Sequence, residues 1–308
     1  MTESTRPPRL AWLVNLFDDP DVQHAHAAAT LRPLAARLGA EVVPVYALDP
    51  GAEPLAALPE VERIPYTAAR LQALLGEHDL PGGEPVIAHP GAGASLRERV
   101  DALAEAMRAV DPQLIAVHTH AYSALDRFFL GSFSEKFFTR SPAPVLVLNP
   151  HTPAVTQMPR LLFATDLSRN AETAFSELLP LAHALGATVH VEHVLPVREL
   201  PLFMSSGASR AQYDAEIAAQ RAQCEAALAV YRALAERAGV SCVVRVDEER
   251  ASLPIGESLE ALAETLDAGL VAVAAHGDHQ RPGNIGSVAL WLMRRAARPV
   301  VVFPARAR

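Results

Sequence analysis

Short apolar segments alternate with amphipathic segments along the first half of the chain. Continuous apolar runs of four to eight residues are typical of buried strands, and apolar residues spaced three and four apart are typical of helices with one buried face. We therefore expect strands at residues 10–17, 41–47, 85–89, 114–118 and 145–148, and helices at 22–38, 66–75, 96–110 and 132–139. This alternation predicts an α/β fold with an open parallel sheet covered by helices on both faces.

The same order of segments returns in the second half. Residues 150–159 hold prolines at both ends and one between, without a periodic pattern, so we interpret them as a linker. Beyond it we expect strands at 160–164, 188–194, 241–246, 270–275 and 300–303, and helices at 171–185, 208–238, 255–266 and from Gly286-Ser287 onward.

A spacing shared by the two halves indicates a tandem repeat. Gly131-Ser132 lies 13 positions before Pro144, and Gly286-Ser287 lies 13 positions before Pro299. The two copies are 155 residues apart in a chain of 308. We therefore predict two Rossmann-like domains, residues 1–150 and 159–308, each large enough for its own core.

The last strand of each copy is apolar along its whole length. Neither 145–148 nor 300–303 contains a charge or a proline, and such strands invite association when they are left as bare edges. We expect the two strands to pair with each other across a pseudo-two-fold axis, which would make the chain an intramolecular pseudo-dimer.

Composition excludes several classes of partner. The net charge of -8 provides no basic surface for nucleic acid. No run approaches the roughly 18 apolar residues of a membrane span, and the first residues include no apolar signal segment. Cys224 and Cys242 are too few for a disulfide framework, which favours a reducing cytoplasm.

Several short motifs occur in a fixed order on these elements. They are the segment from Arg160 to Ser168 (RLLFATDLS), the Leu-Gly-Ala turns at 38–40 and 185–187, His193-Val194, Ala275-His276-Gly277 and Gly286-Ser287. In this order they resemble the universal stress protein family, over nearly the whole chain and twice, as in its tandem two-domain type. The resemblance implies a cytoplasmic stress-response regulator that binds an unknown protein partner, and ATP or a related adenine nucleotide as candidate ligand.

The second half matches a nucleotide site more closely than the first half does. Ligands of open parallel sheets lie at the carboxyl ends of strands, where Asp166 can accept a hydrogen bond from an exocyclic amine. Gly277 and Gly283 loosen the loop after the fourth strand, and the helix that begins at Gly286-Ser287 offers free N–H groups to phosphates. The resemblance implies a site made of Ala164, Thr165, Asp166, Val194, His276, Gly277, Gly286, Ser287 and Val288.

Both halves depart from the glycine pattern of nucleotide-binding family members. That pattern has a glycine, two residues, a second glycine, nine residues and then Gly-Ser or Gly-Thr. The second half has Ala274 at the first glycine and a loop one residue shorter before Gly286. The first half has His118 and Ala121 at both glycines, so we expect it to bind no nucleotide.

Structural explanations stand beside the functional ones. Ser132 and Glu135 match a capping box, and Asp166 could cap the helix that follows it. The same holds for Asp18 or Asp19 in the first half. The pairs His118/His120 and His276/His279 lack the further ligands that zinc requires, so no metal site is predicted.

No nucleophile elbow, Walker motif or other catalytic signature is present. We therefore predict no catalytic residues, and three functions remain open. These are a regulator that senses adenine nucleotide, a ligand-free interaction scaffold, and a weak nucleotide hydrolase or transferase.

Overall fold

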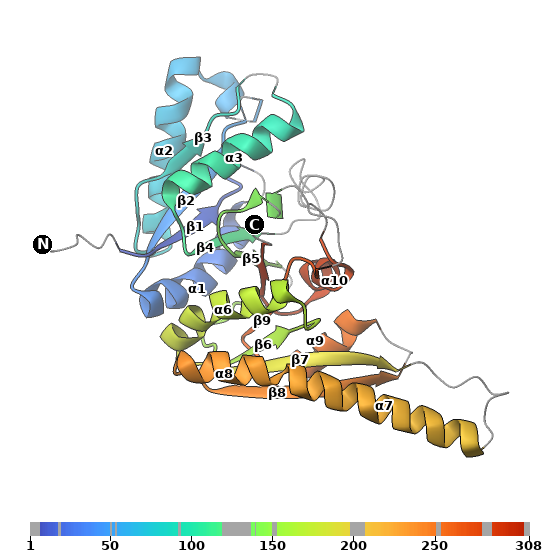
Figure 1. Ribbon diagram of the computed structural model, residues 1–308. Helices are drawn as coiled ribbons and strands as arrows, with labels where there is room; N and C mark the ends of the chain where they lie inside the picture. Colours follow the sequence, from blue (N-terminus) through green and yellow to red (C-terminus); the bar gives the residue numbers. More distant parts are fainter. Residues whose placement is uncertain are drawn as a thin grey trace, which may run out of the picture.

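The computed structural model describes residues 7–17, 20–49, 51–52, 54–91, 94–118, 137–138, 140–149, 153–197, 207–250, 254–278 and 285–304. Their strands form one ten-stranded sheet in the order β3-β2-β1-β4-β5-β10-β9-β6-β7-β8 (Figure 1). The first half contributes β1 (Arg9–Leu13), β2 (Glu41–Ala47), β3 (Val86–Ala88), β4 (Leu114–His118) and β5 (Val145–Leu148). The second contributes β6 (Arg160–Ala164), β7 (Thr188–Val197), β8 (Cys242–Arg250), β9 (Leu270–Ala274) and β10 (Val300–Phe303). Within each half every pairing is parallel, as the apolar strands predict.

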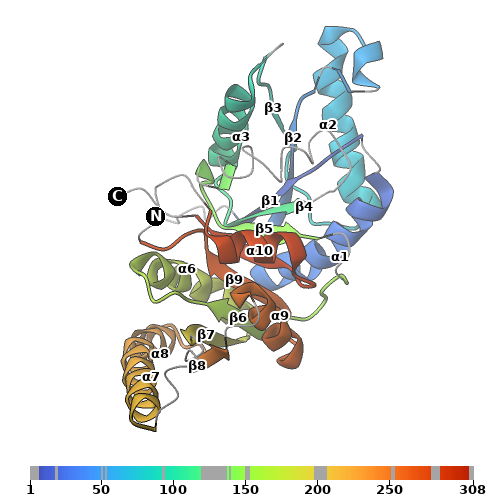
Figure 2. The same cartoon turned by 90° about the vertical axis from the view of Figure 1, so that its right-hand side faces the viewer.

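Helices cover both faces of this sheet. The first half has α1 (Pro20–Leu38), the 3₁₀ turn η1 (Leu55–Ala57), α2 (Glu60–Glu77) and α3 (Leu96–Val110). The second has α6 (Arg169–Leu185), α7 (Gly207–Ala227), α8 (Ala229–Arg237), α9 (Ile255–Thr265) and α10 (Ser287–Arg295). One apolar core joins the sheet to α1, α2, α6 and α8, and a second joins it to α3, α9 and α10. Figure 2 shows α8 and α9 on opposite sides of β6 and β7.

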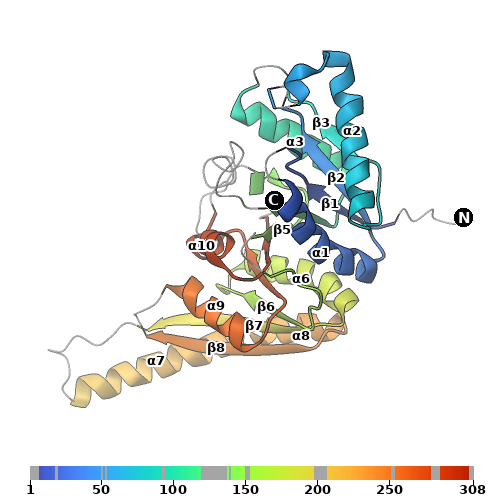
Figure 3. The ribbon, with the colours of Figure 1, turned by 180° about the vertical axis from the view of Figure 1, so that it is seen from behind.

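The two halves meet through their last strands. β5 and β10 pair antiparallel, with Val147 opposite Val300 and Val145 opposite Val302, and both strands are fully buried. On one face of the joined sheet α1 packs against α6 (Figure 3). The pairing of the apolar edge strands is confirmed, because each strand satisfies the free backbone groups of the other.

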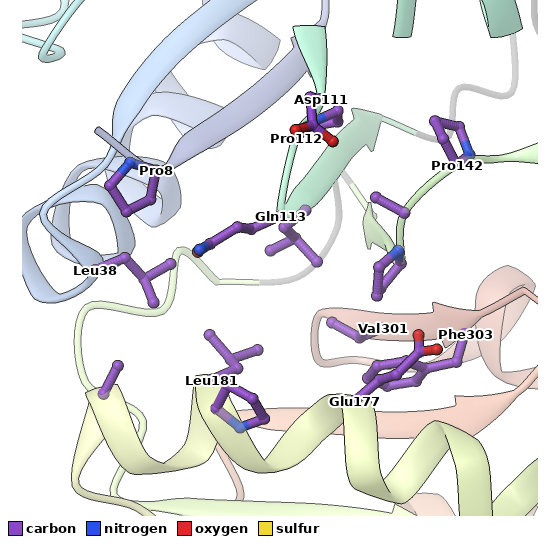
Figure 4. A pocket seen from close by; sticks show the side chains of 15 residues that line it. Pro8, Leu38, Asp111, Pro112, Gln113, Pro142, Glu177, Leu181, Val301 and Phe303 are labelled. Atoms are coloured by element: carbon purple, nitrogen blue, oxygen red, sulfur yellow. The ribbon is translucent and has the colours of Figure 1, made fainter. Parts of the chain in front are cut away.

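The junction also encloses a cavity of about 590 Å³ (Figure 4). Pro8 and Pro142 of the first half face Leu181 of α6 and Phe303 of β10 across it. It lies at the amino ends of β1, β4 and β5 and, because β10 runs antiparallel to β5, beside the carboxyl end of β10.

The structure differs from the sequence expectations mainly in the limits of the elements. The helix expected at 208–238 is two helices, because the N–H of Tyr231 bonds to the carbonyl of Leu228 three residues back and tightens the turn. The expected strand 10–17 ends at Leu13, and the expected helix 66–75 extends over Glu60–Glu77. The Asp18-Asp19 pair and most of the helix expected at 132–139 lie outside the described residues. None of the described helices has the length and apolar character that a membrane crossing needs.

Candidate functional site

A cavity of about 250 Å³ lies where β6, β7 and β9 end and α10 begins. Every residue that the sequence predicts for the site lines this cavity: Ala164, Thr165, Asp166, Val194, His276, Gly277, Gly286, Ser287 and Val288. Its other walls include His193 and Ala274, which belong to the sequence motifs but not to the predicted site. The remaining lining residues, which no sequence pattern singles out, are Ala171, Glu192, Ile255, Leu259, Val273 and Ala289. Distant segments of the second half, from β6, β7, α9, β9 and α10, therefore meet at one place.

The hydroxyl groups of Thr165 and Tyr231 form a buried pair that holds the loop after β6. The Thr165 Oγ1 lies 2.6 Å from the hydroxyl oxygen of Tyr231, and the N–H of Leu167 donates to the same Thr165 oxygen at 2.9 Å. Leu167 takes a left-handed φ of 62°, which an L residue adopts only where its surroundings hold it. Burial raises the pKa of the Tyr231 hydroxyl further above neutral pH, so this pair stays uncharged. Thr165 thus fixes the turn that presents Asp166 to the cavity.

Asp166 lies against Gly277, across the mouth of the cavity. One carboxylate oxygen, Oδ1, accepts the N–H of Ser168 at 3.0 Å. A Cβ on Gly277 would stand 2.2 Å from the other oxygen, Oδ2. Gly277 is therefore required for the close approach of Asp166, in addition to any role beside a ligand.

The two helices that begin at the cavity differ in how their N-termini are satisfied. Ser168 caps α6 by accepting the N–H of Ala171 at 3.2 Å, so Asp166 is not the N-cap. The Asp278 carboxylate accepts the N–H groups of Arg169 and Asn170 at 3.0 and 3.3 Å. By contrast α10 starts from Gly286 without a side-chain cap among the described residues. Its first amide groups are the ones left for an anion.

Two histidines hold the backbone around the cavity. The Nδ1 of His193 lies 2.9 Å from the Thr165 carbonyl oxygen, and the Nδ1 of His276 lies 2.9 Å from the Gly277 carbonyl oxygen. Because a carbonyl only accepts, each Nδ1 donates. In the described part of the chain no three His, Cys, Asp or Glu residues are grouped to hold a metal ion; His279 lies outside it.

Glu192 is the most unusual wall residue. It stands on β7 between Ala164 of β6 and Arg245 of β8, and its side chain is 3 % exposed. Its Oε1 lies 3.5 Å from the Arg245 Nε and accepts no hydrogen bond from the described residues. Burial raises the pKa of Glu192 to about 7, against the opposing effect of Arg245. An acidic residue between the valines of a buried strand is the sequence signal that could have indicated it.

The family model of universal stress proteins matches residues 16–149 and, separately, residues 158–304. The chain belongs to the universal stress protein family. The two matches span most of its length, so it is a tandem member with two universal stress protein domains.

Solved structures agree with this at the level of the fold. A universal stress protein from Archaeoglobus fulgidus is 18% identical, with a TM-score of 0.56 and coverage of 97% of each chain. A functionally unknown protein from Pseudomonas aeruginosa is 15% identical, with a TM-score of 0.57 and coverage of 96% of this chain and 92% of that chain. A universal stress protein solved in complex with cAMP is similar to one half only, at 18% identity, a TM-score of 0.37 and coverage of 49% of this chain and 99% of that chain. No curated protein matches the chain.

The first universal stress protein domain is built differently at the equivalent place. His118 ends β4 as Ala274 ends β9, and its ring packs edge-on against His26 of α1, with centroids 5.3 Å apart. The His26 Nδ1 and the His118 Nε2 are 3.5 Å apart. The remaining predicted features of this loop, Ala121, Gly131, Ser132 and Glu135, lie outside the described residues. That the first half binds no nucleotide stays a prediction.

Proposed function

We propose that this universal stress protein is a non-catalytic cytoplasmic regulator that binds one adenine nucleotide in the cavity of its second half. The base would lie beside Asp166 and Val194, and the phosphates beside the N-terminus of α10. Ala164, Thr165, His276, Gly277, Gly286, Ser287 and Val288 would complete the site. The observation that carries the proposal is the convergence of these residues on one cavity at the carboxyl ends of the strands.

The contrast between the two helix N-termini supports the orientation of the ligand. Asp278 and Ser168 already occupy the amide groups of α6, so a second anion there would meet a carboxylate. The start of α10 carries no side-chain cap among the described residues, and Gly286 and Ser287 both line the cavity. A phosphate is favoured at such a helix start by the free N–H groups and the helix dipole.

A ligand-free interaction scaffold is the second candidate. The volume of about 250 Å³ is below the roughly 300–1,000 Å³ of most ligand pockets, and Ala274 replaces a glycine of the binding pattern. A scaffold would bind neither ATP nor adenosine. A nucleotide-sensing regulator would bind ATP without releasing phosphate, and a hydrolase would bind ATP and release phosphate.

Replacing Asp166 by Ala tests the proposed site. The variant removes one acceptor beside the ligand, so we expect ATP affinity to fall about fivefold or more, as the loss of one hydrogen bond implies. Its thermal stability should change little, because Asp166 is exposed and its one bond to Ser168 is worth about 1 kcal/mol. Calorimetry of ATP binding and thermal unfolding measure the two effects.

Asp278→Ala is the matched control. It removes a carboxylate from the same mouth of the sheet, but one that caps α6 and does not line the cavity. We expect it to lower stability more than ATP affinity. Equal ATP affinity in wild-type protein and Asp166→Ala would remove Asp166 from the site, and absence of ATP binding would favour the scaffold.

A further inference from the structure

The carboxyl group of Glu192 lies in the layer between the sheet and α9. Residues two apart on a strand share a face, so Glu192 faces the same side as Val194. Val194, Ala164 and Leu259 belong to the core between the sheet and helices α9 and α10, and all three line the cavity together with Glu192. The other cavity-lining residues that pack in this core are apolar, so the Glu192 carboxyl is the polar group that a ring lying among them would meet.

The structure provides little compensation for burying this group. The side chain is 3 % exposed, and its Oε1 accepts no hydrogen bond from the described residues. The nearest cation, Arg245, is itself 55% exposed and lies 3.5 Å away without forming a hydrogen bond to that oxygen. A buried acid with an unsatisfied oxygen is destabilising unless a ligand completes its hydrogen bonds.

The protonation state of this carboxyl decides what it can recognise. A neutral carboxyl presents one O–H donor and a carbonyl acceptor, whereas the ionised form only accepts. Adenine presents an amine donor next to a ring-nitrogen acceptor, which is the complement of the neutral form. The ionised form would place a negative oxygen against the lone pair of the ring nitrogen.

We propose that Glu192 is the specificity-determining residue of the cavity and binds, as a neutral carboxyl, the amine and the adjacent ring nitrogen of an adenine base. This inference rests on the proposed nucleotide site and adds the group that reads the base. Because Glu192 has a pKa of about 7, the affinity depends on pH near neutrality.

Other titratable groups lie near Glu192, and the Glu192→Gln variant separates their effect from that of Glu192. Arg245 and Asp247 face it from β8 on the solvent side, and His190 lies on its own strand. Around the cavity the further titratable groups are Asp166, His193 and His276. The two histidines donate from Nδ1 to backbone carbonyls, and burial lowers the pKa of His190. Among the described cavity residues, Glu192 is the acid whose pKa burial raises to about 7, so its carboxyl loses a donor toward the ring as the pH rises.

The test is a calorimetric titration with adenosine between about pH 6 and pH 8.5, because adenosine has no group that titrates in this range. If only the protonated form binds, a pKa of about 7 predicts about a 30-fold weaker affinity at the upper pH. Glu192→Gln keeps a donor and an acceptor at every pH, so its affinity should stay constant. Purine riboside, which lacks the amine, should bind the wild-type protein more weakly than adenosine does.

Glu260→Gln is the matched control. Glu260 is a second partly buried acid whose pKa burial raises, but it accepts the N–H of Ala297 at 2.9 Å and does not line the cavity. This variant should keep the pH dependence of the wild-type protein. If Glu192→Gln fails to fold, the wild-type titration still tests the inference, because an adenosine affinity that does not change with pH contradicts it.

Two results overturn the inference. An adenosine affinity that is independent of pH in the wild-type protein, or that keeps its pH dependence in Glu192→Gln, excludes Glu192 as the reader of the base. ATP binding measured in parallel separates the failures. If ATP binds with the expected dependence on Asp166, only the role of Glu192 is wrong, and if neither ATP nor adenosine binds, the proposed site fails as well.

Discussion

Glu192→Gln should make the ligand-free protein more stable at alkaline pH and leave it unchanged at acid pH. The substitution replaces the buried carboxyl by a neutral group of the same shape. In the folded protein the carboxyl has a pKa of about 7, compared with the ordinary value of 4.5. The folded state therefore holds this proton more tightly than the unfolded state does. Between these two pH values the folded state binds more protons, so the stability of the wild-type protein falls as the pH rises.

The size of the effect follows from the shift. A change of about 2.5 pKa units at 1.36 kcal/mol each amounts to about 3 kcal/mol, reached above pH 7 and absent below pH 4.5. For a cooperative unit of the size of one half, this corresponds to roughly 6 to 12 °C in the unfolding temperature. Arg245 adds no penalty when it loses its partner, because its side chain is 55% exposed and remains hydrated.

Chemical and thermal unfolding, followed by circular dichroism at several pH values, measures the difference between variant and wild type. Glu264→Gln serves as the control, because it makes the same chemical change at an exposed position of α9. We expect the Glu192→Gln difference to grow from near zero to its full value between about pH 4.5 and pH 8. A difference that stays constant across this range would refute the argument, since it would mean that the Glu192 carboxyl does not change charge there.

Two further predictions concern the site and its counterpart. Gly277→Ala should weaken ATP binding at least as much as Asp166→Ala, because a Cβ 2.2 Å from Asp166 Oδ2 displaces that side chain. The variant should lose about 1 kcal/mol of stability, since Asp166 is exposed and can move. The Gly277→Ala/Asp166→Ala double variant should recover that loss in thermal unfolding, and a purely additive result would contradict the clash. Equilibrium dialysis should give no more than one ATP per chain at neutral pH. Two ATP per chain would show that the first half, which contains His118, also binds nucleotide.

The sequence predicts the fold well because the fold depends on patterns that are local. Apolar runs and the shared spacing from Gly131 to Pro144 and from Gly286 to Pro299 are sufficient to predict parallel strands, a tandem repeat and the pairing of β5 with β10. The limits of helices are less predictable. The tight turn at Leu228 depends on one backbone hydrogen bond, and no residue pattern predicts that bond.

The candidate site is only partly accessible from the sequence. Asp166 and Gly286-Ser287 follow from their positions at the ends of elements. The contact of Asp166 with Gly277, and the ring contact of His26 with His118, join residues about a hundred positions apart and require the tertiary fold. The burial of Glu192 cannot be predicted from the sequence for the same reason, because its neighbours across the sheet are known only when the register of β6, β7 and β8 is known.

Comparison of the two halves indicates why the acid at this position is more than a packing defect. Val45 pairs with Leu13 at the end of β1 as Glu192 pairs with Ala164 at the end of β6, and Val45 is completely buried. The same place in the same fold is therefore satisfied by an apolar side chain. In the second half, the carboxyl costs about 3 kcal/mol above pH 7 and one of its oxygens gains no hydrogen bond from the described residues. Local conflicts of this kind are expected where a protein serves function rather than stability. The conflict at Glu192 lies in the wall of the cavity, where a bound base would resolve it.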